Sequence, residues 1–294
     1  MTVKSCLTSM RLRTLPLSLS GVVVGIALGK EICELKPAVV ITLIVTTALL
    51  QILSNLSNEL GDTLSGTDTE GRQGVHYSIQ DGEMTIPQMK KFIAVIAVLC
   101  CISGLGMVLY SFGTIFEFAP AALLVLGAAA IWSAMHYTLG KNPYGYRGLG
   151  DLFVFVFFGI VAVVGAAYVC SHSFRAEWLL PGSAFGLWSI GVLNVNNIRD
   201  MKTDAATRTT VALKLGLRKA RIYHAALICG GWVLMLIWNL ITACNWSEWL
   251  FFVTLPLFAL HLRGVFTRTE RSLDPMLPML VMTTFITALI FLCQ

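Results

Sequence analysis

Charged side chains are scarce along this chain: Asp, Glu, Lys and Arg make up 13% of its 294 residues, against 56% hydrophobic residues. A soluble domain of this length needs far more polar surface to cover its core, so that class of protein is excluded. The sequence also lacks a CxxC pair and any cysteine spacing typical of a metal centre, and its eight cysteines are expected to be small core residues. No linker and no low-complexity stretch divides the chain.

What the sequence has in quantity is long apolar runs. Several of them reach the roughly 20 residues needed to cross a hydrocarbon layer of about 30 Å. We predict nine membrane spans, at approximately 14–29, 36–58, 91–112, 116–137, 151–170, 178–198, 220–242, 248–262 and 275–293. The expected fold is therefore all-α and polytopic, with residues 1–294 forming a single integral-membrane domain.

The basic residues support this number of spans. With nine spans, all but three of the 21 Lys and Arg fall on the side of the N-terminus, the exceptions being Lys30, Lys36 and Arg175. By the positive-inside rule that side is cytoplasmic and the C-terminus lies outside. The net charge of +5 then reflects topology at an anionic membrane surface rather than a nucleic-acid partner. We expect a multi-pass protein of the cell's inner membrane, with the lipid bilayer as its partner.

Two copies of the pattern N-xxx-D end long apolar runs. They are Asn58…Asp62 and Asn196…Asp200, and each is followed by a further aspartate, Asp68 or Asp204. Both copies lie at predicted cytoplasmic helix ends, and their offset of 138 residues suggests two pseudo-repeated halves of about four helices each, with one extra helix. On a continuous helix, Asn196, Asp200 and Asp204 would share one face. The pair of motifs predicts a polar site shared by the two halves.

The residue types in these motifs favour a hard metal ion. Carboxylates that converge from two helix ends repel one another unless a cation lies among them, and oxygen ligands without His or Cys suit Mg²⁺. Mg²⁺ takes one or two carboxylates and completes its shell with water and phosphate oxygens. The nearby bases Arg72, Lys202 and Arg208 would bind phosphate directly. We therefore expect a metal-bound diphosphate at the cytoplasmic mouth of a cavity whose apolar helices hold a hydrocarbon tail.

The motifs resemble the aspartate-rich signatures of the UbiA superfamily of intramembrane prenyltransferases. Within it, the resemblance is to the enzymes that prenylate 1,4-dihydroxy-2-naphthoate in menaquinone synthesis. The matching segments are Arg11–Pro16, Asn58–Asp68, Pro143–Asp151 and Asn196–Gly216. The departures are Glu59, where relatives usually have Asp; Gly74–Ser78, where many carry a Pro and an Arg; and Asp151, which is Glu in many relatives.

The resemblance implies a UbiA-type helical bundle and Mg²⁺-dependent transfer of a polyprenyl group from its diphosphate to dihydroxynaphthoate. CO₂ and pyrophosphate would leave, and demethylmenaquinone would form. It places catalysis on Asp62, Asp200 and Asp151, and metal binding on Asp62, Asp68, Asp200 and Asp204. The substrate-binding candidates are Asn58, Arg72, Lys141, Asn142, Tyr144, Arg147, Asn196, Lys202 and Arg208.

Two other functions fit parts of the pattern. The same chemistry with another acceptor, namely 4-hydroxybenzoate, homogentisate or haem, would use the same motifs. The Pro143–Asp151 segment and the spacing of Asp62 and Asp68 favour the naphthoate type. A secondary transporter would also pair two half-sites, but its acids are expected near the bilayer midplane rather than at cytoplasmic helix ends.

Overall fold

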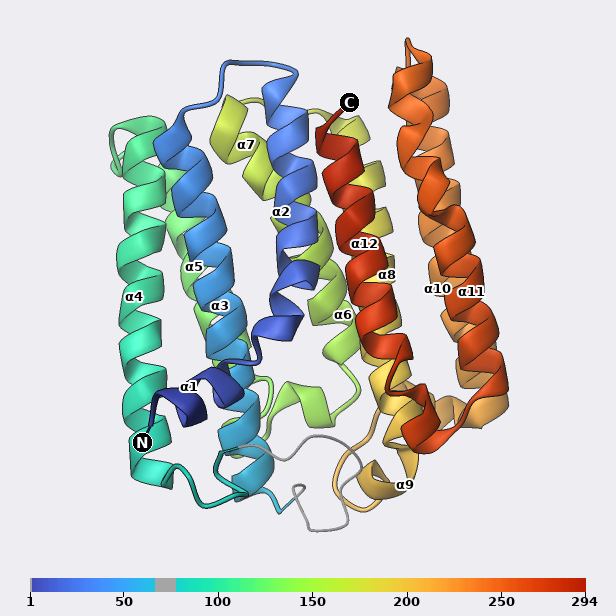
Figure 1. Cartoon of the computed structure of the whole chain (residues 1–294). Coiled ribbons are helices and arrows are strands. Elements are labelled where there is room, and N and C mark those ends of the chain that lie inside the picture. The colour runs from blue at the N-terminus through green and yellow to red at the C-terminus, as the bar shows by residue number, and fades with distance from the viewer. Residues whose placement is uncertain (1, 67–77) are drawn as a thin grey trace. The chain divides into compact units, whose positions relative to one another are not determined.

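The computed structural model describes residues 2–66 and 78–294, and the chain is built almost entirely of long helices (Figure 1). Within those residues, nine helices are long and apolar enough to cross a membrane. The described part contains no strand apart from one isolated β-bridge, between Arg147 and Thr209. The all-α, polytopic fold with nine spans is therefore confirmed. The helices belong to two compact units, which are described separately below.

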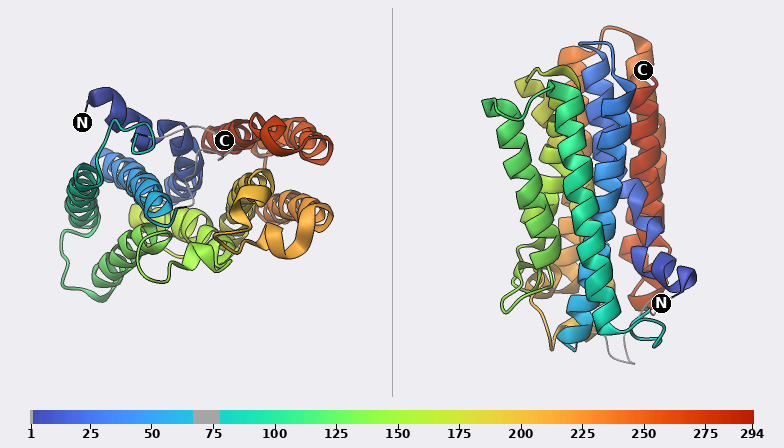
Figure 2. Two further views of the ribbon diagram at one scale, coloured as in Figure 1. Left: turned by 90° about the horizontal axis from the view of Figure 1, so that it is seen from below. Right: turned by 90° about the vertical axis from the view of Figure 1, so that its left-hand side faces the viewer.

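The first unit comprises Met1–Leu15, Lys36–Gly150 and Thr203–Thr209. Three long helices pack side by side in it (Figures 1 and 2): α3 (Pro37–Leu64), α4 (Ile86–Phe112) and α5 (Phe118–His136). The short helix α1 (Val3–Met10) packs on α3, and η2 (Tyr144–Tyr146) is a single 3₁₀ turn. Apolar side chains one helical turn apart on α3, such as Leu53, Leu56 and Leu60, form the core with residues of α4.

Local signals explain where these helices begin. Pro37 occupies the first turn of α3, where its missing N–H has no intrahelical partner to lose. At the start of α4, the Thr85 hydroxyl accepts from the Gln88 N–H and the Gln88 side chain accepts from the Thr85 N–H. α3 continues to Leu64, beyond the predicted end at residue 58. The first acidic motif is consequently still helical.

The second unit comprises Pro16–Leu35, Asp151–Lys202 and Thr210–Gln294. Its core joins Trp188, Trp232 and Phe258 with apolar residues of several helices. The helices are α2 (Leu15–Lys30, entering from the first unit), α6 (Gly150–Val154), the π-helix η3 (Phe155–Gly165), α7 (Ala166–Ser171), η4 (Ala176–Trp178), α8 (Leu179–Arg199), α10 (Val211–Thr242), η5 (Trp246–Thr254), α11 (Leu255–Thr267), η6 (Glu270–Leu273) and α12 (Met276–Leu292). The four-residue helix α9 (Met201–Asp204) is divided along the sequence: Lys202 still belongs to the second unit and Thr203 already to the first.

Glycines let η3 lie in close contact with two neighbouring helices of this unit. A Cβ atom on Gly159 would lie 2.6 Å from the Gly182 carbonyl oxygen and 2.6 Å from the Gly186 Cα atom, both on α8. On α2, a Cβ atom on Gly25 would collide with the Val163 carbonyl oxygen of η3. Small residues at such crossings allow backbones to approach, which is the usual basis of helix packing in membranes.

Two elements differ from the sequence prediction. α8 ends at Arg199, and Asp200 has a non-helical backbone (φ −93°, ψ 8°) before α9 begins. The expected single helical face across 196–204 is therefore wrong. α10 starts at Val211, ahead of the predicted residue 220, with a non-helical Gly216 (φ 73°) inside it. Its first turns carry Lys and Arg, so a search for apolar runs could not include them.

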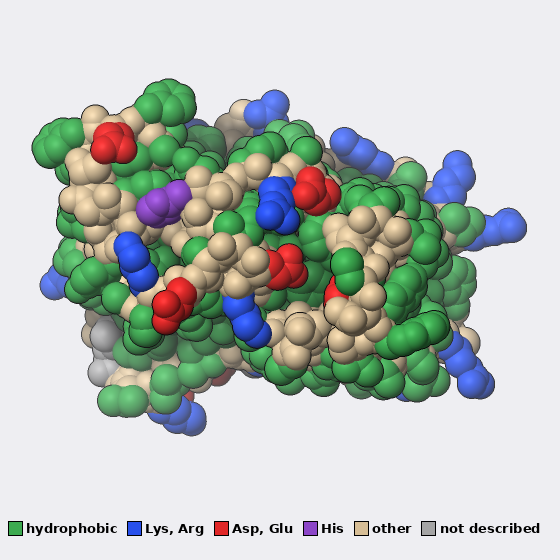
Figure 3. Space-filling model, turned by 90° about the horizontal axis from the view of Figure 1, so that it is seen from above, with side chains coloured by type: hydrophobic (Ala, Val, Ile, Leu, Met, Phe, Trp, Pro, Cys, Tyr) green, Lys and Arg blue, Asp and Glu red, His purple; other side chains and the backbone are tan. Residues whose placement is uncertain are grey.

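The molecular face seen from above carries few charged side chains (Figure 3). Lys and Arg lie apart from one another on it, with Asp and Glu among them and apolar or uncharged groups between. This face therefore presents no broad basic patch of the kind that binds nucleic acid.

Candidate active site

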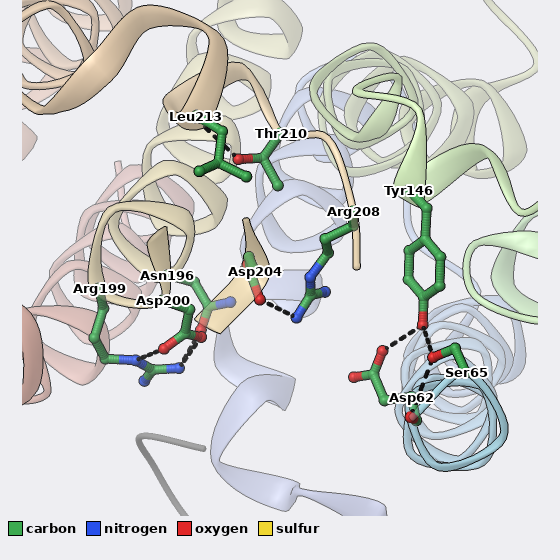
Figure 4. A network of polar contacts seen from close by, with 10 residues as sticks. All are labelled: Asp62, Ser65, Tyr146, Asn196, Arg199, Asp200, Asp204, Arg208, Thr210 and Leu213. Atoms are coloured by element: carbon green, nitrogen blue, oxygen red, sulfur yellow. Dashed lines mark hydrogen bonds and ion pairs between the residues drawn. The ribbon is translucent and has the colours of Figure 1, made fainter. Parts of the chain in front are cut away.

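The first acidic motif lies at the C-terminal end of α3. Asp62 is 3% exposed, and its Oδ1 atom accepts a hydrogen bond of 2.8 Å from the Tyr146 hydroxyl (Figure 4). That hydroxyl also lies 2.9 Å from the Ser65 Oγ atom. One turn before Asp62, the half-buried Asn58 accepts a 3.3 Å hydrogen bond from Thr138. The Asp62 carboxylate is therefore held by a tyrosine from a loop more than 80 residues away in sequence.

Backbone pairing brings the end of the second motif to the same tyrosine. The Thr209 N–H donates to the Tyr146 carbonyl oxygen at 2.9 Å, within the bridge between Arg147 and Thr209. Arg208 consequently lies beside Tyr146, with its Cζ atom 5.8 Å from the centroid of the ring. The Arg208 guanidinium pairs with Asp204 at 2.8 Å (Figure 4). Asp204 and Arg208 thus belong to the first unit, as Asp62 does.

The charges of the two motifs act on one cation. The side chains of Arg208 and Asp204 are only 10% and 2% exposed. Burial lowers the pKa of Arg208, but the nearby carboxylates of Asp62 and Asp204 outweigh that effect and raise this pKa above its ordinary value. The guanidinium therefore stays charged, between one acid from each motif.

Asp200 lies in a separate cluster within the second unit. Arg199 donates to both of its carboxylate oxygens, at 2.7 Å from Nε and 2.6 Å from Nη2 (Figure 4). The same guanidinium binds Asn196 Oδ1 at 2.8 Å and Asp274 Oδ1 at 3.1 Å. The sequence analysis named neither Arg199 nor Asp274 as a site residue. Asp274 follows a different span, so no spacing rule linked it to the motif.

The other predicted site residues have varied surroundings. Asp151, at the start of α6, accepts a 2.8 Å hydrogen bond from Tyr223 of α10. Lys202 is exposed and pairs with Glu270. Lys141, Asn142 and Arg147 are all exposed on the loop that follows α5. Asp68 and Arg72 lie outside the described residues.

Tyr144 and Tyr146 share the turn η2 but have different partners. The Tyr144 hydroxyl donates to the Ser133 carbonyl oxygen at 2.8 Å in the interior of the first unit, and burial raises the pKa of Tyr144 to about 12. Tyr146 instead holds Asp62. The sequence analysis named Tyr144 as a candidate and missed Tyr146. Both tyrosines occur in the same loop segment, and only the folded turn determines which side chain points toward Asp62.

The donor set near Arg208 fits a magnesium ion. Asp62 and Asp204 supply buried carboxylate oxygens, and no sulfur or imidazole ligand is needed for such an ion. In the described part of the chain, no group of three His, Cys, Asp or Glu side chains gathers around one point. Two carboxylates agree with the few protein ligands that Mg²⁺ takes when substrate phosphates complete its shell.

Comparisons with known proteins show which family the chain belongs to. Residues 18–289 match the UbiA prenyltransferase family. The chain is 38% identical to the 1,4-dihydroxy-2-naphthoate octaprenyltransferase of Escherichia coli (strain K12), covering 97% of this chain and 92% of that protein. It is 36% identical to the protein of the same name from Haemophilus influenzae, over 96% of this chain and 92% of that protein.

Solved structures share the fold. A UbiA homologue from Aeropyrum pernix, solved in its apo form, matches with a TM-score of 0.70 at 17% identity, over 94% of this chain and 98% of that one. A homologue from Archaeoglobus fulgidus, bound to DMAPP and Mg²⁺, matches with a TM-score of 0.62 at 13% identity, over 98% and 99%. The chain belongs to the UbiA prenyltransferase family, and the family predicted from its motifs is confirmed.

Proposed function

We propose that this protein transfers a polyprenyl group from polyprenyl diphosphate to 1,4-dihydroxy-2-naphthoate, releasing pyrophosphate and CO₂ and giving demethylmenaquinol, the reduced form of demethylmenaquinone. The observation that carries the proposal is the convergence of one acid from each motif, Asp62 and Asp204, on the buried Arg208. Relatives that are 36–38% identical over nearly their whole length are named for this reaction. The combination favours the naphthoate acceptor over 4-hydroxybenzoate or homogentisate.

The proposed roles follow from charge. Asp62 and Asp204 would hold Mg²⁺, and Arg208 would bind diphosphate oxygens by charge-assisted hydrogen bonds. Before substrate binds, the positive charge of Arg208 compensates the negative charges of these two acids. When bound, the metal stabilises the negative charge that develops on the departing pyrophosphate. The Tyr146 hydroxyl keeps the Asp62 carboxylate in one orientation throughout.

The remaining candidates complete this assignment. Asp200 would supply the second motif's other carboxylate; it is oriented by Arg199, which also donates to Asn196. Asp68 would be a further metal ligand, and Asn58 would support the metal's water shell. A further set of four bases and one amide would meet the substrate at the cytoplasmic surface; they are Arg72, Lys141, Asn142, Arg147 and Lys202.

The whole chain would act as one catalytic domain. The family match runs from residue 18 to residue 289, across segments of both compact units. The motifs would lie on the cytoplasmic side of the inner membrane, which the distribution of Lys and Arg supports. The apolar helices would shield the allylic carbon from water while the aromatic ring attacks it.

Product analysis tests the proposal. Purified protein is given a polyprenyl diphosphate and either dihydroxynaphthoate, 4-hydroxybenzoate or homogentisate, with Mg²⁺ or with EDTA, and the products are identified by mass spectrometry. We expect prenylated naphthoquinol only from dihydroxynaphthoate and only with Mg²⁺. Turnover of another acceptor without turnover of dihydroxynaphthoate would refute the proposed acceptor, and full activity in EDTA would refute the metal.

A further inference from the structure

A carboxylate and a phenol face each other within the second unit. Tyr223, on α10, donates its hydroxyl hydrogen to the Asp151 Oδ2 atom at 2.8 Å. Both side chains are partly exposed. Among the described residues, Asp151 forms no ion pair with Lys, Arg or His, whereas Asp200 and Asp204 each lie against an arginine.

Because no Lys, Arg or His among the described residues pairs with Asp151, we can narrow the kind of group that the Asp151–Tyr223 pair can bind. A carboxylate without a compensating base repels a diphosphate, so the polar head of the prenyl donor is a poor occupant. Tyr223 contributes one hydrogen bond to Oδ2, and Oδ1 has lone pairs that accept from a second donor. A hydroxyl group on an aromatic ring is a donor of the right kind, and hydrogen bonds to an ionised acceptor are the strong ones.

We propose that Asp151 accepts the ring hydroxyl of the aromatic acceptor, and that Tyr223 is the positioning residue that fixes the Asp151 carboxylate for this contact. The inference rests on the proposed function, since it needs a hydroxylated aromatic substrate. It assigns the two substrates to different polar groups. The diphosphate binds where arginine and paired acids lie, and the acceptor binds where an acid and a phenol lie.

The chemistry of decarboxylative prenylation gives Asp151 a task. Asp151 takes the proton from the hydroxyl next to the ring carboxylate, and the oxygen's electron pair forms a C=O bond. The ring carbon that carries the carboxylate bonds to the allylic carbon, whose bond to the diphosphate oxygen breaks. The resulting β-keto carboxylate loses CO₂, the electron pair returns to the ring, and the oxygen recovers its proton from Asp151. No proton is gained or lost overall, and general base catalysis of this kind contributes about 10²–10⁴-fold.

Because Asp151 lies at the start of a helix, its carboxylate needs a hydrogen-bond partner on another helix to fix its orientation. Asp151 directly follows the glycine that opens α6, and α6 continues without a break into the π-helix η3. A carboxylate at the start of a helix has several open rotamers, and one hydrogen bond from α10 selects among them. A π-helical segment is rare and frequently occurs at a functional site.

Steady-state kinetics on full-length variants test the pair. For Tyr223→Phe we expect the KM for dihydroxynaphthoate to rise about tenfold, near the lower end of the range for one hydrogen bond to a charged group, with the KM for prenyl diphosphate unchanged. Asp151→Asn should lower kcat by roughly 10²-fold or more, and Asp151→Glu should recover part of that loss. The double variant should be no worse than Asp151→Asn, because Tyr223 acts through Asp151.

The control is Tyr110→Phe, since Tyr110 is 58% exposed on α4 and is expected to behave as the wild type. An unchanged acceptor KM in Tyr223→Phe would overturn the inference. So would equal rises in both KM values together with a lower Tm, which would mark Tyr223 as a structural brace only. Failure of the proposed function is a distinct outcome, because the wild type itself would then not prenylate dihydroxynaphthoate. If another aromatic compound is the acceptor, the same variants are compared with that acceptor.

Discussion

At the scale of single residues, Arg208 is the centre of the site. It is buried, it pairs with Asp204 at 2.8 Å, and the charges of Asp62 and Asp204 raise its pKa although burial lowers it. Removing one partner from a buried group of charges costs about 3–5 kcal/mol, because the remaining charge loses its compensation. Arg208 therefore stabilises this group of charges, and we propose that it also binds the diphosphate.

The two tyrosines of η2 offer a matched test at this scale. Tyr146→Phe removes the hydroxyl that holds Asp62, whereas Tyr144→Phe removes one bonded to Ser133 in the interior. We expect each variant to lose about 1 kcal/mol of stability, and only Tyr146→Phe to raise the KM for prenyl diphosphate, by several-fold. Thermal unfolding and steady-state kinetics measure the two effects. Equal KM values for prenyl diphosphate in the two variants would show that Tyr146 does not contribute to binding this substrate.

The residue types and the spacing of the motifs were enough to predict Asp62, Asp204 and Arg208 as members of one site. They were insufficient for Tyr146, because it lies two residues from Tyr144 in a loop and both are tyrosines. The side chain that faces Asp62 is decided by the backbone bonds of Tyr146 to Thr209 and of Gly145 to Tyr137. Such pairings depend on the folded loop and leave no periodic pattern in the sequence.

At the scale of elements, the π-helix η3 packs closely against α8. The contact at Gly159 is made by backbone atoms of Gly182 and Gly186, which have no side chain that moves aside. Gly165 is the last residue of η3, and a Cβ atom added to it would have its nearest neighbour at 3.8 Å, in the Val161 side chain of the same helix. The two glycines therefore differ in whether a methyl group can be accommodated.

We expect Gly159→Ala to destabilise the protein by about 1–3 kcal/mol, the usual cost of overpacking, and Gly165→Ala to leave the stability unchanged. Thermal unfolding of the two purified variants in the same detergent compares them directly. A Gly159→Ala variant as stable as Gly165→Ala would show that η3 and α8 do not approach as closely as described.

Most helix ends were predictable to within a few residues, because apolar runs end where polar residues begin. The exceptions have a common cause. α3 and α10 extend into polar and charged sequence, at Asn58–Leu64 and Val211–Lys219, where hydropathy no longer marks the helix. α1 was not predicted because its buried side chains, Ser5 and Ser9, are polar. These helical segments are identified by their backbone hydrogen bonds in the structure and not by the composition of the sequence.

At the scale of the whole molecule, the distribution of charge and the family match agree. Nine apolar helices among the described residues account for a chain with 13% charged residues, and the asymmetric distribution of Lys and Arg supports the proposal that both acidic motifs lie on one side of the membrane. The two motifs are 138 residues apart, yet the end of the second lies in the same compact unit as the first. We propose that the fold makes one site from these two distant segments.

Binding of the prenyl donor tests that claim most directly. Affinity for a non-hydrolysable prenyl thiodiphosphate is measured by calorimetry for the wild type, Asp62→Asn and Asp204→Asn, each with Mg²⁺ and with EDTA. We predict Mg²⁺-dependent binding to the wild type and a loss of about 10–100-fold in both variants, since each removes a carboxylate of one metal site. Binding that is independent of Mg²⁺, or a loss in one variant with wild-type affinity in the other, would contradict a single site shared by the two motifs.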